Sequence, residues 1–156
     1  MEKPDLVYMV FIATSAEQLW ALLTSAEESP KWFFGNRIEL GNAPGDGYRV
    51  IRSSGETVVD GGVLAIEPPH RLRVRWDMPG SPLGEGRANE VEYRIDQAAE
   101  GVVKLSVLEY HYTPVPEDWQ RAGREGWSLI LSSLKTILET GRPLPPVTPS
   151  HPEEQP

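Results

Sequence analysis

Two ionisable residues at the end of an apolar strand are the strongest candidates for chemistry in this sequence. In the segment 102–112, apolar residues alternate along one face, and strict alternation places Glu109 and His111 on that same face. An apolar enclosure disfavours the charged form of a carboxyl group and lets an imidazole titrate near neutrality. Such a pair suits general acid–base catalysis or the anchoring of a ligand. A bulge or the end of the strand would instead return both side chains to solvent.

Large aromatic side chains are predicted to gather around the same interior. They are Trp32, Phe33, Tyr48, Trp76, Tyr93 and Trp127. A buried Tyr O–H or Trp N–H needs a partner, so a cluster of these rings suits an amphipathic ligand. The same rings could equally fill a core, because large apolar residues mostly serve packing. We therefore take them as candidate ligand-binding residues with both interpretations open.

Two glycines lie in the first turns of a predicted C-terminal helix, where each costs about 1 kcal/mol relative to alanine. They are Gly123 and Gly126. Close approach of the helix to the sheet would explain them most simply, and a ligand against the backbone is the alternative. On the second explanation, Gly126 and Trp127 border the mouth of a cavity.

Metal and nucleotide chemistry find no support in the sequence. His70, His111 and His151 are scattered without a ligand-spaced partner, and the chain has no cysteine. The glycines between 80 and 86 lie in a turn, not between a strand and a helix as a nucleotide-binding loop requires. We expect no metal and no cofactor.

Charge and composition limit the classes of partner that the protein can have. The 156 residues carry a formal net charge of −8, which repels phosphate backbones and anionic lipid, so we expect neither nucleic acid nor membrane as a partner. The apolar run 6–13 is shorter than a membrane span. Absence of cysteine suits a reducing compartment, and we expect a cytoplasmic protein that is a monomer or a weak homodimer.

The elements that position these residues begin with a strand at 7–13, a helix at 16–23 and a second short helical piece that ends near 32–34. From Arg37 to Tyr112, turn clusters separate short β-like runs, which predicts a meander of six or seven strands including the first. The runs are 48–52, 57–67, 71–77, 89–98 and 102–112.

Two of these strands alternate cleanly. Leu72, Val74 and Trp76 face inward, while Arg71, Arg73 and Arg75 share a charged face that we expect to be solvated. Glu90 and Glu92 lie on the corresponding face of the next strand, so cross-strand ion pairs are predicted, each worth roughly 0.2 to 1 kcal/mol.

The last predicted element is a long amphipathic helix from Glu117 to Thr140, ended by Gly141 and Pro143. At around 22 residues it would be roughly 33 Å long and could cross a whole sheet. Residues 143–156 contain six prolines and predict a disordered tail, which leaves 1–142 as a single domain.

Four stretches resemble a known family. They are FIATSAEQLWALLTSAE at 11–27, Trp32 with Phe33, GGVLAIEPPHRLRVRW at 61–76 and GWSLILSSLKTILETGRPL at 126–144. Together they resemble the SRPBCC group of the START-like, or birch-pollen-allergen-like, superfamily, and within it the activator of heat-shock-protein-ninety ATPase homologues. The resemblance implies an α+β helix-grip fold. In this fold a curved antiparallel sheet wraps a long C-terminal helix and leaves a cavity between them, with two short helices after the first strand.

Such folds host lipid carriers, hormone receptors, aromatase and cyclase enzymes and cochaperones, so the resemblance leaves three hypotheses. The favoured one is a non-enzymatic protein that binds a lipid-like or polycyclic apolar molecule. The second is a cyclase-like or aromatase-like enzyme that uses Glu109 and His111. The third is a chaperone-interacting module, although this chain begins almost at its first predicted strand, whereas the eukaryotic activators have a separate N-terminal domain. Both ligand hypotheses predict that Glu109, His111, Trp76 and Trp127 share a cavity of several hundred Å³.

Overall fold

The computed structural model describes residues 2–81 and 87–147. In chain order its elements are β1 (Leu6–Ile12), α1 (Ala16–Thr24), the 3₁₀ turn η1 (Ser29–Lys31), β2 (Arg37–Leu40), β3 (Gly47–Ile51), β4 (Thr57–Glu67), β5 (Arg71–Trp76), β6 (Asn89–Ala99), β7 (Val102–Tyr110) and α2 (Glu117–Thr140). The predicted α+β helix-grip architecture is confirmed. The second of the two short helices is a single turn and ends before Trp32.

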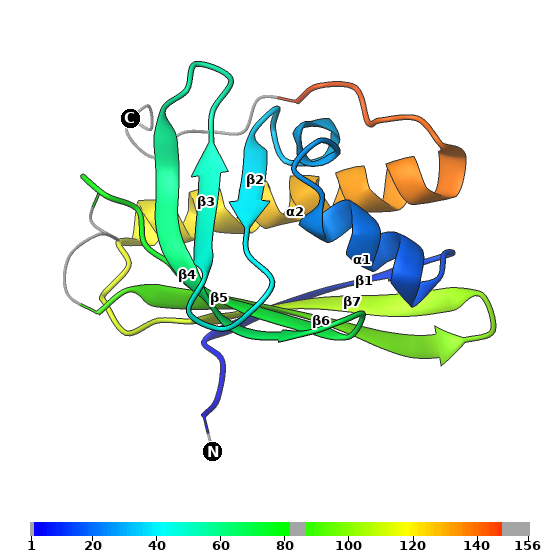
Figure 1. The fold of residues 1–156 in the computed structure, drawn as a ribbon, viewed down its shortest axis with the longest axis horizontal. Coiled ribbons are helices and arrows are strands. Elements are labelled where there is room, and N and C mark those ends of the chain that lie inside the picture. Colours follow the sequence, from blue (N-terminus) through cyan, green and yellow to red (C-terminus); the bar gives the residue numbers. More distant parts are fainter. Residues whose placement is uncertain (1, 82–86, 148–156) are drawn as a thin grey trace.

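The seven strands form one antiparallel sheet in the order β1-β7-β6-β5-β4-β3-β2. Figure 1 shows the sheet bending so that β1, β5, β6 and β7 lie along one side of α2 while β2 and β3 rise across another. The bend falls in β4, whose pairing with β5 shifts register between Val63 and Ala65. Such bulges increase the local twist and curve a strand. The curved sheet therefore encloses α2 instead of lying flat against it.

The entry to α1 is capped by a serine side chain. The Ser15 side chain accepts a hydrogen bond from the backbone N–H of Gln18, which satisfies one of the free donors of the first turn. Leu19, Leu22 and Leu23 then face the interior. This short helix covers the end of the sheet opposite the N-terminus of α2 (Figure 1).

The long helix α2 has 24 residues and ends where the sequence predicts. Gly141 adopts a left-handed conformation with φ of 77°, and its N–H bonds to the carbonyl of Ile137. A left-handed C-terminal residue is cheapest when it is glycine, because it has no Cβ. Within the part of the chain that the structure describes, no helix is long and apolar enough to cross a membrane.

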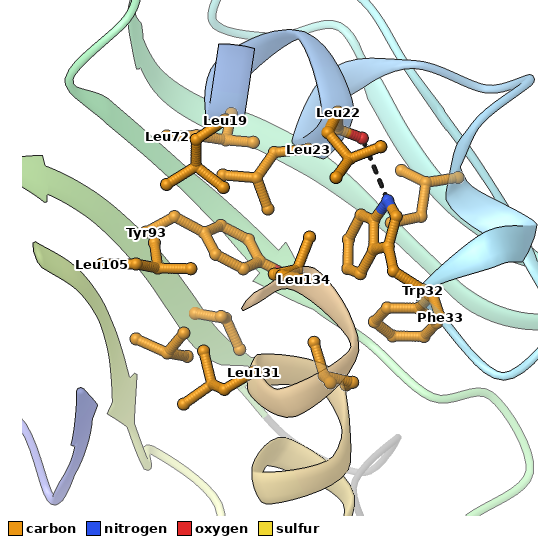
Figure 2. Packing of buried hydrophobic residues seen from close by; sticks show 14 of the residues in the cluster. Leu19, Leu22, Leu23, Trp32, Phe33, Leu72, Tyr93, Leu105, Leu131 and Leu134 are labelled. Carbon is orange, nitrogen blue, oxygen red and sulfur yellow. Dashed lines mark hydrogen bonds between the residues drawn. The ribbon is translucent and has the colours of Figure 1, made fainter. Parts of the chain in front are cut away.

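The core lies between the inner face of the sheet, α1 and the C-terminal half of α2. Figure 2 shows Leu131 and Leu134 of α2 packed against Tyr93 and Leu105 of the sheet, with the α1 leucines opposite. Trp32 lies on the other side of this core and donates its indole N–H to the carbonyl of Leu22 at 3.0 Å. The indole dipole is thereby satisfied inside an apolar environment.

The outer face of β5 and β6 corrects one expectation. The predicted cross-strand pairing is present, with Arg73 opposite Glu92 in the register. The face is less solvated than we expected, however, because the Glu92 side chain is 0% exposed beneath the arginines that pair with it. Long guanidinium side chains cover the shorter carboxylate and leave their own heads partly in water.

The predicted disordered tail lies largely outside the described residues, since it is described only as far as residue 147, and so does His151. Residues 143–147 form neither helix nor strand. The predicted domain boundary at residue 142 stays a prediction.

Candidate functional site

A cavity of about 550 Å³ opens where the N-terminal half of α2 passes over one end of the sheet. Its wall combines the ends of β5, β6 and β7 with the loop before β2, the β3–β4 turn and about three turns of α2. The residues that line the cavity include Phe33, Phe34, Trp76, Glu109, His111, Gly123, Gly126 and Trp127. The volume lies within the range typical of small-molecule sites.

The structure divides the nine predicted site residues into two groups. The six on the cavity wall are Phe33, Trp76, Glu109, His111, Gly126 and Trp127. The remaining three are buried in the core: Trp32, Tyr48 and Tyr93. Glu109, His111, Trp76 and Trp127 thus share one cavity of several hundred Å³, as both ligand hypotheses require.

Aromatic rings form the inner wall of the cavity. The ring centroids of Trp76 and Trp127 are 5.8 Å apart, and Phe33 lies 6.3 Å from Trp76. Trp76 comes from the end of β5 and Trp127 from α2, so the wall joins the sheet to the helix. Tilted pairs at these distances attract one another beyond their burial of area. The result is a polarisable apolar surface suited to a flat or polycyclic molecule.

Glu109 holds part of this wall in place. Its Oε1 accepts the indole N–H of Trp127 at 3.0 Å, and its Oε2 accepts the hydroxyl of Tyr8 at 3.3 Å. The side chain is 18% exposed, so these bonds lie at the border between the cavity and the core. Because each carboxylate oxygen accepts a bond from a different neutral donor, Glu109 fixes the Trp127 indole and the Tyr8 hydroxyl relative to each other.

His111 lies beside this carboxylate although it has left the strand. β7 ends at Tyr110, one residue earlier, and the His111 backbone N–H bonds to the Asp5 carboxylate at 2.7 Å. That anchor keeps the ring on the cavity side, with Nε2 3.5 Å from Glu109 Oε2. The hydrogen bond with Glu109 raises the pKa of His111 against the opposing effect of burial. Strand alternation thus predicted the right face for His111, whereas a separate contact holds it there.

Two buried hydroxyls lie behind the aromatic wall. Tyr48 packs against Trp76 with ring centroids 5.9 Å apart, and Tyr93 packs edge-on against Trp127 at 6.0 Å. Neither hydroxyl oxygen has a hydrogen-bond partner within the described structure. Burial raises the pKa of both phenols well above the ordinary value, so both remain protonated at any physiological pH.

The space around the two glycines of α2 contradicts the explanation that the helix approaches the sheet too closely for a side chain. A Cβ on Gly123 would meet nothing within 4 Å, and one on Gly126 would meet only Phe34, at 4.0 Å. Close approach of the helix to the sheet therefore does not require glycine at either position. Both glycines instead lie on the cavity wall, where a larger side chain would occupy the enclosed volume.

Sequence reasoning missed two residues of the site. Tyr8 was unremarkable in the sequence because its place beside Glu109 depends on the pairing of the distant strands β1 and β7. Phe34 was seen only as the end of a helical piece, yet it has φ of 54°, a conformation uncommon for a non-glycine residue. The left-handed turn brings the Phe34 ring to the cavity wall. No sequence pattern indicates this conformation.

Among residues 2–81 and 87–147, no group of three His, Cys, Asp or Glu side chains is placed to hold a metal ion.

The family follows from the sequence match. Residues 13–139 match the model of the family described as Activator of Hsp90 ATPase homolog 1-like protein. The chain belongs to this family. The matched range runs from the end of β1 almost to the end of α2 and includes every residue of the aromatic wall. The resemblance predicted from the four sequence stretches is thereby confirmed.

Solved structures share the fold. The Aha1 dimer from Colwellia psychrerythraea superposes with a TM-score of 0.69 at 20% identity, covering 87% of this chain and 96% of that one. PFC0360w, an HSP90 activator from Plasmodium falciparum, gives 0.71 at 18% identity, covering 87% and 96%. DynU16, a putative protein in the dynemicin biosynthetic locus, gives 0.70 at 25% identity, and covers 88% of this chain but 48% of that one. No curated protein matches the chain by sequence.

Proposed function

We propose that this family member is a non-enzymatic binding protein for an apolar small molecule of lipid-like or polycyclic type. The cavity of about 550 Å³ with its wall of tryptophan and phenylalanine is the observation that supports the proposal. Such a volume accommodates a drug-sized molecule, and apolar walls with few polar groups are the usual composition of these sites.

The glycines of α2 add a second, energetic argument. Each glycine inside a helix costs about 1 kcal/mol relative to alanine, and no packing contact requires Gly123 or Gly126. A side chain at either position would project into the cavity, so the glycines keep the volume open at a cost to the fold. Such a loss of helix stability is expected when ligand binding needs the open volume.

The test is to fill the cavity from the helix. Gly126→Leu adds an isobutyl group to the wall, and Ser128→Leu adds the same group to the solvent-exposed face of the helix two residues away. The probe is the uncharged dye N-phenyl-1-naphthylamine, whose fluorescence rises in apolar sites. We expect Gly126→Leu to abolish the fluorescence increase and Ser128→Leu to retain it, with both variants folded by circular dichroism.

Unchanged dye binding in Gly126→Leu would contradict a cavity site. The natural ligand is sought by solvent extraction and mass spectrometry of protein purified from its native host. Absence of any co-purified molecule, together with absence of dye binding by the wild type, would count against the proposal as a whole.

An acid–base enzyme is the second candidate, because Glu109 and His111 approach to 3.5 Å on the cavity wall. The likeness to DynU16, from a biosynthetic locus, adds to it. A linear poly-β-ketone thioester serves as the trial substrate of a cyclase-like reaction. The enzyme hypothesis requires cyclised product from the wild type and its loss in Glu109→Gln with the fold intact.

A chaperone-interacting role is the third candidate and is supported by the family itself and by the likeness to an HSP90 activator. A binding protein that acts through its cavity alone should leave the ATPase rate of the host's Hsp90 unchanged. Stimulation that survives in Gly126→Leu would assign the activity to the surface and not to the cavity.

A further inference from the structure

Asn89, the first residue of β6, lies on the inner face of the sheet at the cavity wall. It shares this face with Val91 and Tyr93, the next residues of the same alternation, and it lines the cavity. Only 6% of Asn89 is exposed. An amide withdrawn from water is costly unless its polar atoms find partners. The partners of its oxygen and its nitrogen therefore show what the side chain does.

The side-chain oxygen of Asn89 serves the fold. Oδ1 accepts the backbone N–H of Tyr112 at 2.8 Å and that of Thr113 at 3.0 Å, in the segment that follows β7. Two N–H donors on one atom fix the orientation of the amide, because a flipped side chain would turn its own NH₂ group toward them. Nδ2 is therefore the end of the amide that remains for another purpose.

The Asn89 nitrogen makes no hydrogen bond to the protein and still has accessible surface. Nδ2 donates to no group within residues 2–81 and 87–147, where the two bonds of the side chain are both made by Oδ1. The fully buried side-chain atoms that lack a partner in this part of the chain are the hydroxyl oxygens of Tyr48 and Tyr93, and Nδ2 is not among them. Because the cavity is the open space that this residue lines, the amide donor faces the cavity.

The charge beside Asn89 determines which acceptor suits this donor. Glu109 lies opposite Val91, one inward-facing position from Asn89, and such diagonal neighbours are about 7 to 8 Å apart. The Glu109 carboxylate is held by neutral donors and one imidazole, without a permanent counter-charge. A second carboxylate brought to Asn89 would be repelled by the first, whereas an uncharged carbonyl oxygen would not. The acceptor that fits is a neutral carbonyl group.

The strand pairing also places an aromatic ring beside the donor. Trp76 is the partner of Asn89 in the register of β5 and β6, and both residues line the cavity. Side chains that are directly opposite in an antiparallel pair have their Cβ atoms about 4.5 to 5.5 Å apart. A molecule in which the carbonyl group is attached directly to a ring could therefore contact the indole and the amide together.

We infer that Asn89 is a specificity-determining residue of the cavity, where Nδ2 donates a hydrogen bond to the uncharged carbonyl oxygen of a ligand whose apolar ring packs against Trp76. The inference rests on the proposed binding function and narrows the ligand class to apolar molecules that carry a ketone, ester or related carbonyl group on a ring. Three naphthalene compounds are suitable probes. 2-Acetylnaphthalene carries a ketone, 2-ethylnaphthalene lacks the oxygen, and 2-naphthoate carries a carboxylate.

Displacement of N-phenyl-1-naphthylamine measures the affinity for each compound. The wild type should bind 2-acetylnaphthalene about fivefold more tightly than 2-ethylnaphthalene, the effect of one neutral hydrogen bond. It should bind 2-naphthoate more weakly than the ketone, because Glu109 repels the carboxylate.

Asn89→Asp separates the ligand role from the structural one. The aspartate keeps an oxygen for the backbone N–H groups of Tyr112 and Thr113, which favour its ionised form, but it has no N–H to donate. The preference for the ketone should disappear while the fold, measured by circular dichroism, and the affinity for 2-ethylnaphthalene are retained. Asn42→Asp is the matched control, because it makes the same change at an exposed asparagine outside the cavity wall and should keep the preference.

NMR spectroscopy gives a readout that a purely structural asparagine would not produce and that needs no variant. The side-chain amide protons of Asn89, assigned by triple-resonance experiments, should move further downfield with 2-acetylnaphthalene than with 2-ethylnaphthalene. Equal shifts with the two compounds, a ketone preference that survives in Asn89→Asp, or tightest binding of 2-naphthoate overturns the role of Asn89 while the binding proposal stands. Failure of the wild type to bind any of the three compounds or N-phenyl-1-naphthylamine overturns the proposed function, and the role of Asn89 with it.

Discussion

Two carboxylates on neighbouring strands of the same sheet meet opposite environments. Glu92 of β6 faces outward and Glu109 of β7 faces the cavity. Both are withdrawn from solvent, with 0% and 18% of the side chain exposed. What separates them is the kind of donor around each.

The outer carboxylate is surrounded by guanidinium groups. Glu92 Oε1 lies 3.2 Å from Arg71 and 3.7 Å from Arg73, and Oε2 pairs with Arg94. Arg73 in turn bonds Glu90 and stacks on the Tyr110 ring. This outer cluster joins strands β5, β6 and β7 with permanent charges, so its contribution is structural.

The inner carboxylate is surrounded by neutral donors and one imidazole. The Tyr8 hydroxyl, the Trp127 indole and the His111 ring all reach Glu109. These partners come from β1, α2 and the segment after β7, so this inner cluster ties the cavity wall together without a permanent counter-charge. The comparison teaches that the place of a carboxylate in the sheet does not by itself determine its role. The type of donor that bonds to the carboxylate determines it. Permanent ion pairs secure the outer face, whereas neutral donors and one imidazole hold the cavity wall.

The largest effect is expected in the outer cluster. Glu92→Gln keeps the shape and removes the charge that three arginines share, which should lower the free energy of unfolding by about 2 kcal/mol. A fully buried pair would cost more, but the Arg71 and Arg94 side chains are 32% and 48% exposed and can turn to water. Urea denaturation measures the change.

The matched control for this variant is Glu67→Gln, which removes an Arg71 partner that is 63% exposed and should cost less than about 0.5 kcal/mol. N-phenyl-1-naphthylamine binding should be unaffected in both variants. If Glu92→Gln were as stable as the wild type, or if it lost dye binding, the assignment of the outer cluster to structure alone would be wrong.

Much of this contrast could be predicted from the sequence, and the missing part has a clear physical origin. Alternation in 71–77 and 89–98 placed the arginines opposite the glutamates, because side-chain direction in a strand follows a period of two. The depth of Glu92 was not predictable, since it depends on how three long side chains fold over it. The apolar period of α2 and its glycine end were likewise predicted, because both are local properties.

The inner cluster depended on contacts distant in sequence. Tyr8 and Glu109 are 101 residues apart, and only the pairing of β1 with β7 brings them together. Burial of Tyr48 and Tyr93 behind the wall instead of on it was also beyond the sequence, because alternation gives the face of a strand and not the depth along it. The cavity itself depends on how far α2 stands from the sheet, a distance that no local pattern encodes.

A pH dependence should distinguish the two clusters. The bond to Glu109 raises the pKa of His111 in the folded state. The stabilisation from this pair is therefore complete below the unfolded pKa of about 6.5 and is lost as pH rises through the higher folded pKa. The wild type should lose less than about 1 kcal/mol of stability relative to His111→Gln between pH 6 and about 8.

Urea denaturation across this pH range measures the loss, and Glu109→Gln should remove it as completely as His111→Gln does. Arginine does not titrate in this range, so Glu92→Gln should leave the pH dependence as it is in the wild type. A pH dependence that persists in Glu109→Gln would show that another group causes it.

The smallest effect is expected from Tyr8→Phe. The change removes one donor at 3.3 Å from Glu109 Oε2, while the Trp127 bond to Oε1 and the His111 contact remain. A long neutral bond at a half-buried site should contribute about 0.5 kcal/mol, measured by urea denaturation at pH 7. The pH dependence of His111 should survive, because the imidazole keeps the same carboxylate. A loss as large as that in Glu92→Gln would mean that the inner cluster secures the fold as firmly as the outer one, and the contrast between the two carboxylates would be wrong.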